Sequence, residues 1–184
     1  MTTLEDLQFA LSNEGQTLLS ELAQAPITPA NHLQIATKLR KTVAPPLAQA
    51  LLELALLRQL GTVKFSKADQ MYFTRPALEQ ATAEPVASYR AERFNRLGLK
   101  HIADLGCSIG GDAIALAAHA QVTGVDWDPV RLAMAQENLT VYGRSHNFSP
   151  LQADLHSLSP QSFDALFFDP ARRDERGRRF FSVH

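Results

Sequence analysis

A short apolar run that breaks at glycines and resumes as an alanine-rich segment constrains this chain more than any other feature. The break reads Asp104-Leu-Gly-Cys-Ser-Ile-Gly-Gly-Asp112, and residues 113–118 that follow are typical of a helix. A strand that turns at glycines into a helix leaves a bare backbone turn and free helix N–H groups facing a crevice, where parallel sheets hold nucleotide-like ligands. The segment therefore predicts a strand–turn–helix unit with a ligand site at the turn.

A second acid follows the next apolar run at the distance expected for a ribose contact. Residues 121–125 end at Asp126, which lies 22 residues after Asp104. In nucleotide-binding sheets an acid at about that distance accepts hydrogen bonds from ribose hydroxyls. Trp127 follows Asp126 in the sequence. Its two alternative roles are stacking on the adenine and packing in the core. We expect Asp104 and Asp126 to flank an adenosine-containing cofactor.

The two halves of the chain differ in hydrophobic pattern. Residues 1–97 show helical spacing and proline starts, such as Pro45-Pro46 before a leucine-rich helix that Gly61 ends. From residue 98 on, apolar runs alternate with helical segments; the runs are 100–105, 121–126, 147–153 and 163–168. Alternating strands and helices predict a parallel sheet covered by helices. We expect an α/β protein with a helical N-terminal domain, residues 1–97, and a Rossmann-like, doubly wound domain, residues 98–184.

The apolar run at 163–168 is the fourth candidate strand. A doubly wound sheet of this type continues beyond its fourth strand, and natural folds avoid leaving an apolar strand unpaired at an edge. We therefore expect a sheet truncated after its fourth strand. The edge after residue 168 would be covered by further C-terminal residues or by another chain.

Two further acids end the third and fourth runs. Asp154 stands where a carboxylate can meet an adenine amino group or cap a helix. Asp169-Pro170 follows the fourth run, at the mouth of the crevice beside the first strand. The Asp169 carboxylate and the carbonyl near Pro170 would accept hydrogen bonds from a substrate amine and hold its lone pair toward an electrophilic methyl group. An ordinary Asp-Pro turn is the alternative.

Composition and charge exclude several classes of function. The formal net charge of −1 gives no general reason to expect a nucleic-acid or membrane partner. The longest apolar stretch, near residues 47–57, is too short to span a bilayer, and the N-terminal residues lack the pattern of a signal peptide. A single cysteine, Cys107, excludes an internal disulfide, and no metal-ligand spacing is present. We expect a cytoplasmic protein without a metal or a membrane partner.

A local cluster of arginines is strongly basic, in contrast to the near-zero net charge of the whole chain. It consists of Arg172, Arg173, Arg176, Arg178 and Arg179. Arginine forks suit phosphates and fit an RNA substrate. Pairing with Asp174 and Glu175 within an exposed loop is an equally weighted alternative.

Taken together, residues 98–172 resemble the class I S-adenosylmethionine-dependent methyltransferases. The turn at 104–110 is similar to their first motif, and Asp169-Pro170 is similar to their catalytic-loop motif. Asp126 stands where these enzymes have a ribose acid, and Asp154 where they have an adenine-side acid. The resemblance implies S-adenosylmethionine as cofactor and Asp169 and Pro170 as catalytic residues. The cofactor-binding residues that follow from the turn and strand ends are Asp104, Gly106, Ser108, Gly110, Asp126, Trp127 and Asp154.

More narrowly, three stretches resemble bacterial methyltransferases that carry a C-terminal THUMP-like domain and are relatives of trimethylguanosine synthase. The stretches are 71–82, 104–112 and 168–173. Phe73 and Thr74 lie in a segment similar to one that helps close the cofactor pocket in trimethylguanosine synthase, so they join the cofactor-binding candidates. The resemblance implies methyl transfer to RNA, at a base amine.

Two positions depart from the family pattern. Ser108 stands where methyltransferases generally have a middle glycine, and Asp169-Pro-Ala-Arg172 lacks the aromatic residue that usually ends the amine-methylating motif. An NAD-type oxidoreductase is an alternative, against which the broken G-x-G-x-x-G spacing argues. A non-catalytic cofactor-binding fragment, inactive by itself, is another. S-adenosylmethionine-dependent methyl transfer is the leading hypothesis.

Overall fold

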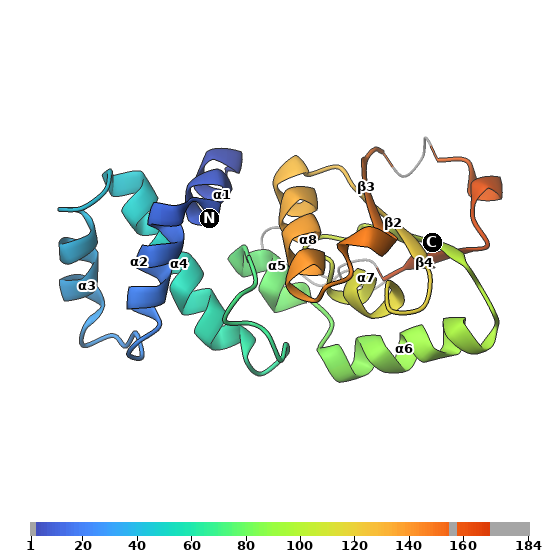
Figure 1. The fold of residues 1–184 in the computed structure, drawn as a ribbon, viewed down its shortest axis with the longest axis horizontal. Coiled ribbons are helices and arrows are strands. Elements are labelled where there is room, and N and C mark those ends of the chain that lie inside the picture. Colours follow the sequence, from blue (N-terminus) through green and yellow to red (C-terminus); the bar gives the residue numbers. More distant parts are fainter. Residues whose placement is uncertain (1–2, 155–157, 170–184) are drawn as a thin grey trace, which may run out of the picture.

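The computed structural model describes residues 3–154 and 158–169 of the 184-residue chain. The N-terminal half contains α1 (Leu4–Leu11), α2 (Asn13–Leu22), α3 (His32–Leu39), α4 (Pro45–Gly61), α5 (Arg75–Gln80) and α6 (Glu84–Arg96). It is followed by β1 (His101–Leu105), α7 (Gly111–Leu116), β2 (Gln121–Asp126), α8 (Pro129–Val141), η1 (Ser145–Asn147), β3 (Phe148–Gln152), η3 (Pro160–Ser162) and β4 (Ala165–Phe168). Helices α1–α4 lie at one end of the molecule and the sheet at the other, with α5 between them (Figure 1). The predicted α/β fold with a helical N-terminal region is confirmed.

Local sequence signals account for several helix ends. Pro45 and Pro46 begin α4, which ends at Gly61, and the Asp128 side chain caps α8 by accepting hydrogen bonds from Val130 N and Arg131 N. Four leucines of α4 are buried because α1, α2, α3 and α5 all pack against it; they are Leu51, Leu52, Leu54 and Leu57. Within residues 3–154 and 158–169, no helix is both long enough and apolar enough to cross a membrane.

The four strands form one parallel sheet in the order β3-β2-β1-β4. All four predicted strands are confirmed, with ends shifted by at most two residues. Because β2 and β4 lie on opposite sides of β1, the chain reverses its direction across the sheet between them, and ligands bind at such switch points. Leu105 pairs with both Val125 and Phe168, so the carboxyl ends of these three strands are neighbours.

Strands β3 and β4 are the two edges of the sheet in the described part of the chain. Leu151, Leu166 and Phe168 on these strands are exposed. Phe167 instead faces the helical half and packs edge-on against Phe94 of α6, with 6.0 Å between ring centroids. What covers the edge after residue 168 lies outside the described residues and stays a prediction.

The helical half packs directly on the sheet half. Helix α6 lies beside α7, and α1 contacts α8 (Figure 1). The fully buried Asn138 of α8 accepts a hydrogen bond from Tyr72 N at 2.8 Å and donates to Tyr72 O and Ile109 O, each at 3.0 Å. Asn138 thereby ties the segment before α5 to the glycine turn. The domain boundary at residue 97 falls between α6 and β1 and stays a prediction.

Candidate functional site

Four carboxylates gather where β1, β2 and β4 end. Asp104 lies on β1, Asp126 ends β2, Asp169 follows β4, and Asp112 belongs to the first turn of α7. Asp112, Asp126 and Asp169 all lie close enough to Asp104 to raise the pKa of its carboxyl group. The expectation that the acids at separate strand ends converge around the glycine turn is therefore confirmed.

The turn between β1 and α7 uses left-handed backbone conformations at three positions. The φ angles are +75° at Gly106, +51° at Ser108 and +82° at Gly110. A Cβ at Gly110 would lie 3.0 Å from Leu139 Cδ2, so both conformation and packing against α8 require glycine there. A Cβ at Gly106 would meet open space, so only the conformation requires glycine. The turn thus leaves room for a ligand beside Gly106.

Strand β2 occupies several N–H groups of the turn. Gly106 N and Cys107 N donate to Val125 O at 2.7 and 3.0 Å, and Ser108 N donates to Asp126 Oδ2 at 2.9 Å. These three N–H groups precede α7, so the expectation that free helix N–H groups face the crevice stays a prediction. Because β2 ends one residue beyond β1 in the register, the Val125 carbonyl and the Asp126 carboxylate reach the turn. The turn is therefore held in place by the protein itself.

Asp126 is a structural part of the turn as well as a candidate ligand contact. Only 4% of the residue is exposed, and its Oδ1 accepts a second backbone hydrogen bond from Asp128 N at 3.0 Å. A carboxylate has about four lone-pair sites, so each oxygen still has capacity for a further donor such as a ribose hydroxyl.

Asp104 differs from Asp126 because one of its oxygens is left over. The residue is 3% exposed, and Oδ2 has no hydrogen-bond partner among the residues that the structure describes. Burial, followed by repulsion from Asp112 and Asp126, raises the pKa of Asp104 to about 8, although a hydrogen bond from the Ala113 backbone opposes the shift. Asp104 is therefore mostly protonated at pH 7. An unused buried oxygen among acids calls for a donor or a cation.

Asp169 is held by a residue that the sequence analysis did not single out. Arg90 of α6 donates from Nη1 to Asp169 Oδ2 at 2.8 Å and to Asp112 Oδ1 at 3.1 Å. Burial favours a lower pKa for Arg90, but the hydrogen bonds to Asp169 and Asp112 outweigh it and raise the pKa. Arg90 and Asn138 both act across long sequence separations, so no local pattern could have revealed either.

Comparison with known proteins assigns the two halves separately. Residues 102–173 match the family described as "Methyltransferase domain", and residues 3–61 match a "Domain of unknown function (DUF8688)". Two Mycobacterium tuberculosis proteins, from strains CDC 1551 / Oshkosh and ATCC 25618 / H37Rv, are each described as an uncharacterized S-adenosylmethionine-dependent methyltransferase and are 41% identical over 138 residues. The α/β half has a class I methyltransferase fold. The match covers 71% of this chain but 37% of either relative, so the chain spans little more than a third of their length.

Solved methyltransferase structures are similar over part of the chain. An RNA methyltransferase from Salinibacter ruber in complex with S-adenosyl-L-homocysteine is 24% identical, with a TM-score of 0.41, and the alignment covers 46% of this chain and 57% of that one. The N-terminal domain of EvdMO1 with S-adenosylhomocysteine bound is 28% identical, with a TM-score of 0.39 and coverage of 44% and 36%. Because these scores are low, the fold assignment rests on the sequence matches and on the strand order.

The remaining residues predicted to bind the cofactor differ from one another in exposure: some are exposed, one is fully buried, and one caps a helix. Trp127 is 68% exposed, which excludes core packing and leaves the adenine contact as a prediction. Asp154 is exposed and lies two residues beyond β3. Phe73 is fully buried against Phe65, with 5.9 Å between ring centroids, and Thr74 caps α5 by accepting a hydrogen bond from Ala77 N. Cofactor contacts of Phe73, Thr74 and Asp154 stay predictions.

The Ala81-Thr82 segment, which follows α5, lies near the start of α7. A Cβ built on Gly111 would lie 3.7 Å from Thr82 O and 3.8 Å from Ala81 Cβ. The loop between α5 and α6 therefore covers the start of α7. Pro170 and the arginines from 172 to 179 lie outside the described residues, so their predicted roles are not placed.

The remaining candidate for nucleophilic chemistry is inert. Cys107 is buried, and burial, followed by the charges of Asp104 and Asp126, raises the pKa of its thiol well above the usual value. Among the residues that the structure describes, no group of three or more His, Cys, Asp or Glu side chains could hold a metal ion.

Proposed function

We propose that this protein transfers a methyl group from S-adenosylmethionine to RNA, at a base amine. The observation that carries the proposal is the buried Oδ2 of Asp104, which has no hydrogen-bond partner among the described residues and belongs to the strand that leads into the open turn at Gly106. The methyltransferase match over residues 102–173 and the S-adenosylmethionine-dependent relatives support the same cofactor. The surplus of carboxylates at the strand ends suits a ligand with both a sulfonium and an ammonium group.

The residues fit the parts of this cofactor. Asp104 would meet the ammonium group of the methionine end, because its free oxygen is an acceptor without a donor. Asp126 would accept from ribose hydroxyls with the lone pairs that its two backbone hydrogen bonds leave over. Gly106 would allow close approach of the cofactor to the backbone, since no atom lies within 4 Å of its Cβ position.

On the acceptor side, Asp169 would orient the substrate. Bound S-adenosylmethionine supplies an electrophilic methyl group on a sulfonium. Asp169 would accept a hydrogen bond from the acceptor amine and so point the nitrogen lone pair at that methyl group. The acceptor amine would gain the methyl group as the carbon–sulfur bond breaks, and it would release one proton to solvent. Catalysis would come mainly from alignment, because no nucleophile of the chain takes part.

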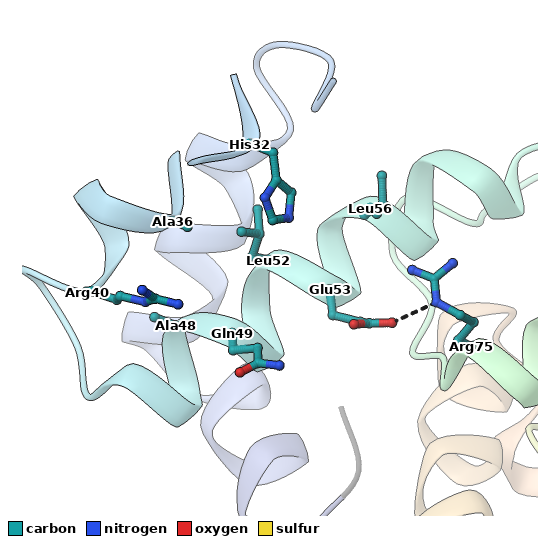
Figure 2. Close-up of a pocket in the computed structure, with 9 residues that line it drawn as sticks. All are labelled: His32, Ala36, Arg40, Ala48, Gln49, Leu52, Glu53, Leu56 and Arg75. Carbon is teal, nitrogen blue, oxygen red and sulfur yellow. Dashed lines mark hydrogen bonds and ion pairs between the residues drawn. The ribbon is translucent and has the colours of Figure 1, made fainter. Parts of the chain in front are cut away.

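RNA as the acceptor class is supported by charge in the helical half. A hollow of about 290 Å³ lies between α3, α4 and the start of α5 (Figure 2). Its apolar floor includes Leu52 and Leu56, and its rim includes His32, Arg40 and Arg75. Arg75 is paired with Glu53, with 3.1 Å between Nε and Oε1. The hollow thus combines an apolar floor with cationic side chains.

The sequence around this hollow is unusually basic for a chain of net charge −1. Residues 22–52 contain no Asp or Glu, whereas Lys38, Arg40 and Lys41 follow one another closely. The backbone N–H of Arg40 donates to Ala36 O, but its guanidinium makes no hydrogen bond or ion pair within the described part of the chain. Guanidinium groups stack on exposed bases and pair with phosphates, so this region fits single-stranded RNA. The hollow lies apart from the strand ends, so it would hold the substrate rather than the reacting atoms.

The alternatives are weaker. An NAD-type oxidoreductase is not favoured, because the matched family is a methyltransferase domain and Ser108 interrupts the G-x-G-x-x-G spacing. The resemblance to bacterial methyltransferases with a THUMP-like domain, and through them to trimethylguanosine synthase, is part of our proposal and rests on residues 71–82, 104–112 and 168–173.

The test is a pair of measurements on the protein. In calorimetry, S-adenosylhomocysteine should bind and NAD should not; binding of NAD alone would overturn the cofactor assignment. With radiolabelled S-adenosylmethionine, label should enter total RNA and not protein or DNA, and RNase should remove it. Binding without transfer to RNA would leave the cofactor site standing and refute the RNA proposal.

A further inference from the structure

Arg90 connects four separate segments at the ends of the strands. Its Nη1 donates to Asp112 of α7 at 3.1 Å, to Asp169 after β4 at 2.8 Å, and to Thr82 Oγ1 in the loop before α6 at 3.2 Å. The guanidinium also lies over the Phe167 ring, with 5.6 Å from Cζ to the ring centroid. Arg90 thus contacts the cofactor side and the acceptor side of the site at once.

The carboxylate of Asp169 needs such a partner to keep a fixed direction. Its side chain is 43% exposed and follows the last residue of an edge strand, and the acids Asp104 and Asp112 lie nearby. Repulsion from the Asp112 carboxylate would drive Asp169 away from the crevice and into solvent. A planar guanidinium in contact with Asp112, Asp169 and the Phe167 ring has few rotamers open to it, so it fixes the Asp169 carboxylate.

We propose that Arg90 is a positioning residue, which holds the Asp169 carboxylate against the first turn of α7 and so sets the acceptor side of the site. The inference rests on the proposed function, because it takes Asp169 as the group that orients the acceptor. The inference also gives the helical half a role in the site, because α6 supplies the side chain that aligns the Asp169 carboxylate.

A purely structural ion pair is the competing explanation, and the exposure of the groups helps to separate the two. The Arg90 side chain is 33% exposed, and ion pairs that reach solvent contribute little to stability. Removing Arg90 should therefore change the melting temperature little while it misaligns Asp169. A structural role would instead show as lost stability without a specific dependence on Asp169.

The experiment uses R90A, R90K and a matched control, R93A, which removes an exposed arginine from the same helix. S-adenosylhomocysteine affinity in calorimetry should stay within threefold for all three variants. Amide hydrogen exchange at residues 166–169 should accelerate about tenfold in R90A, remain unchanged in R93A, and be partly restored in R90K, because lysine keeps the charge but loses the planar fork. Equal exchange in R90A and the unmodified protein would overturn the inference, even if no cofactor bound.

A double-mutant cycle supplies the functional readout. R90A should lower kcat for methyl transfer to RNA at least tenfold, whereas in a D169N background the same change should lower it less than threefold. Equal losses in both backgrounds would mean that Arg90 does not act through Asp169. If the unmodified protein binds no S-adenosylhomocysteine, the proposed function fails, and the exchange measurement still decides the role of Arg90.

Discussion

The ends of β1 and β2 carry the same residue type at nearly the same depth, but the two residues have different hydrogen-bond partners. Asp104 and Asp126 are 3% and 4% exposed. Both oxygens of Asp126 accept backbone hydrogen bonds, from Ser108 N and Asp128 N, whereas Oδ2 of Asp104 has no partner among the described residues. Depth alone therefore does not set how many backbone donors reach a strand-end acid.

Because of this difference, the two strand-end acids have different roles in the site. Asp126 is already hydrogen-bonded within the protein, and it holds the turn between β1 and α7 in place. Asp104 has an oxygen without a protein donor among the described residues, and burial raises its pKa to about 8. Removing Asp126 should therefore damage the turn, whereas neutralising Asp104 should relieve it.

The largest effect is expected from Asp126→Ala. The change leaves Ser108 N and Asp128 N without acceptors and removes the ribose contact. S-adenosylmethionine affinity should fall at least tenfold in calorimetry, and the free energy of unfolding should fall by about 2–3 kcal/mol in denaturant titration. Asp128→Ala is the matched control, because it keeps the backbone N–H that bonds to Asp126 and removes the cap of α8 together with the ion pair to Arg131. Unchanged affinity in Asp126→Ala would remove the ribose assignment.

A smaller effect of opposite sign is expected from Asp104→Asn. The folded protein holds this proton up to a pKa of about 8, whereas the unfolded chain releases it near pH 4, so stability should fall as pH rises between these values and level off above pH 8. Between pH 6 and pH 8 the loss should be about 2 kcal/mol. The Asn variant lacks that loss and should be the more stable protein at pH 8.

Urea unfolding at the two pH values measures this difference. Asp126→Asn serves as the comparison, because its replacement should not remove the pH dependence that Asp104 causes. If the unmodified protein and Asp104→Asn lose equal stability from pH 6 to pH 8, Asp104 is already ionised and the contrast between the strands disappears.

The smallest effect is expected from Ser108→Gly. A non-glycine residue at φ +51° costs about 1 kcal/mol, and the greater freedom of glycine in the unfolded chain offsets part of that gain. Stability should rise by about 0.5 kcal/mol, or about 1–2 °C in melting temperature. A clear loss of stability would show that the serine side chain supports the turn.

The fold was largely predictable because its signals are local. Glycines at 106 and 110, the Asp128-Pro129 helix start and the four apolar runs each specify backbone conformation within a few residues. The cofactor class agrees with the matched relatives. The hydrogen bonds from the N–H groups of Gly106, Cys107 and Ser108 to β2 were not predictable, because they depend on a neighbouring strand that local sequence does not place.

The sequence by itself determined which residues stand at the ends of strands, because chain periodicity and turn chemistry act over short distances. Only the tertiary structure decided that Asp104 holds its proton, that Asn138 fastens Tyr72 to the turn, and that Arg90 reaches Asp169. These properties depend on burial and on partners far away in the sequence. Electrostatic energies in a buried site are set by the whole packed surroundings, and no stretch of sequence contains them.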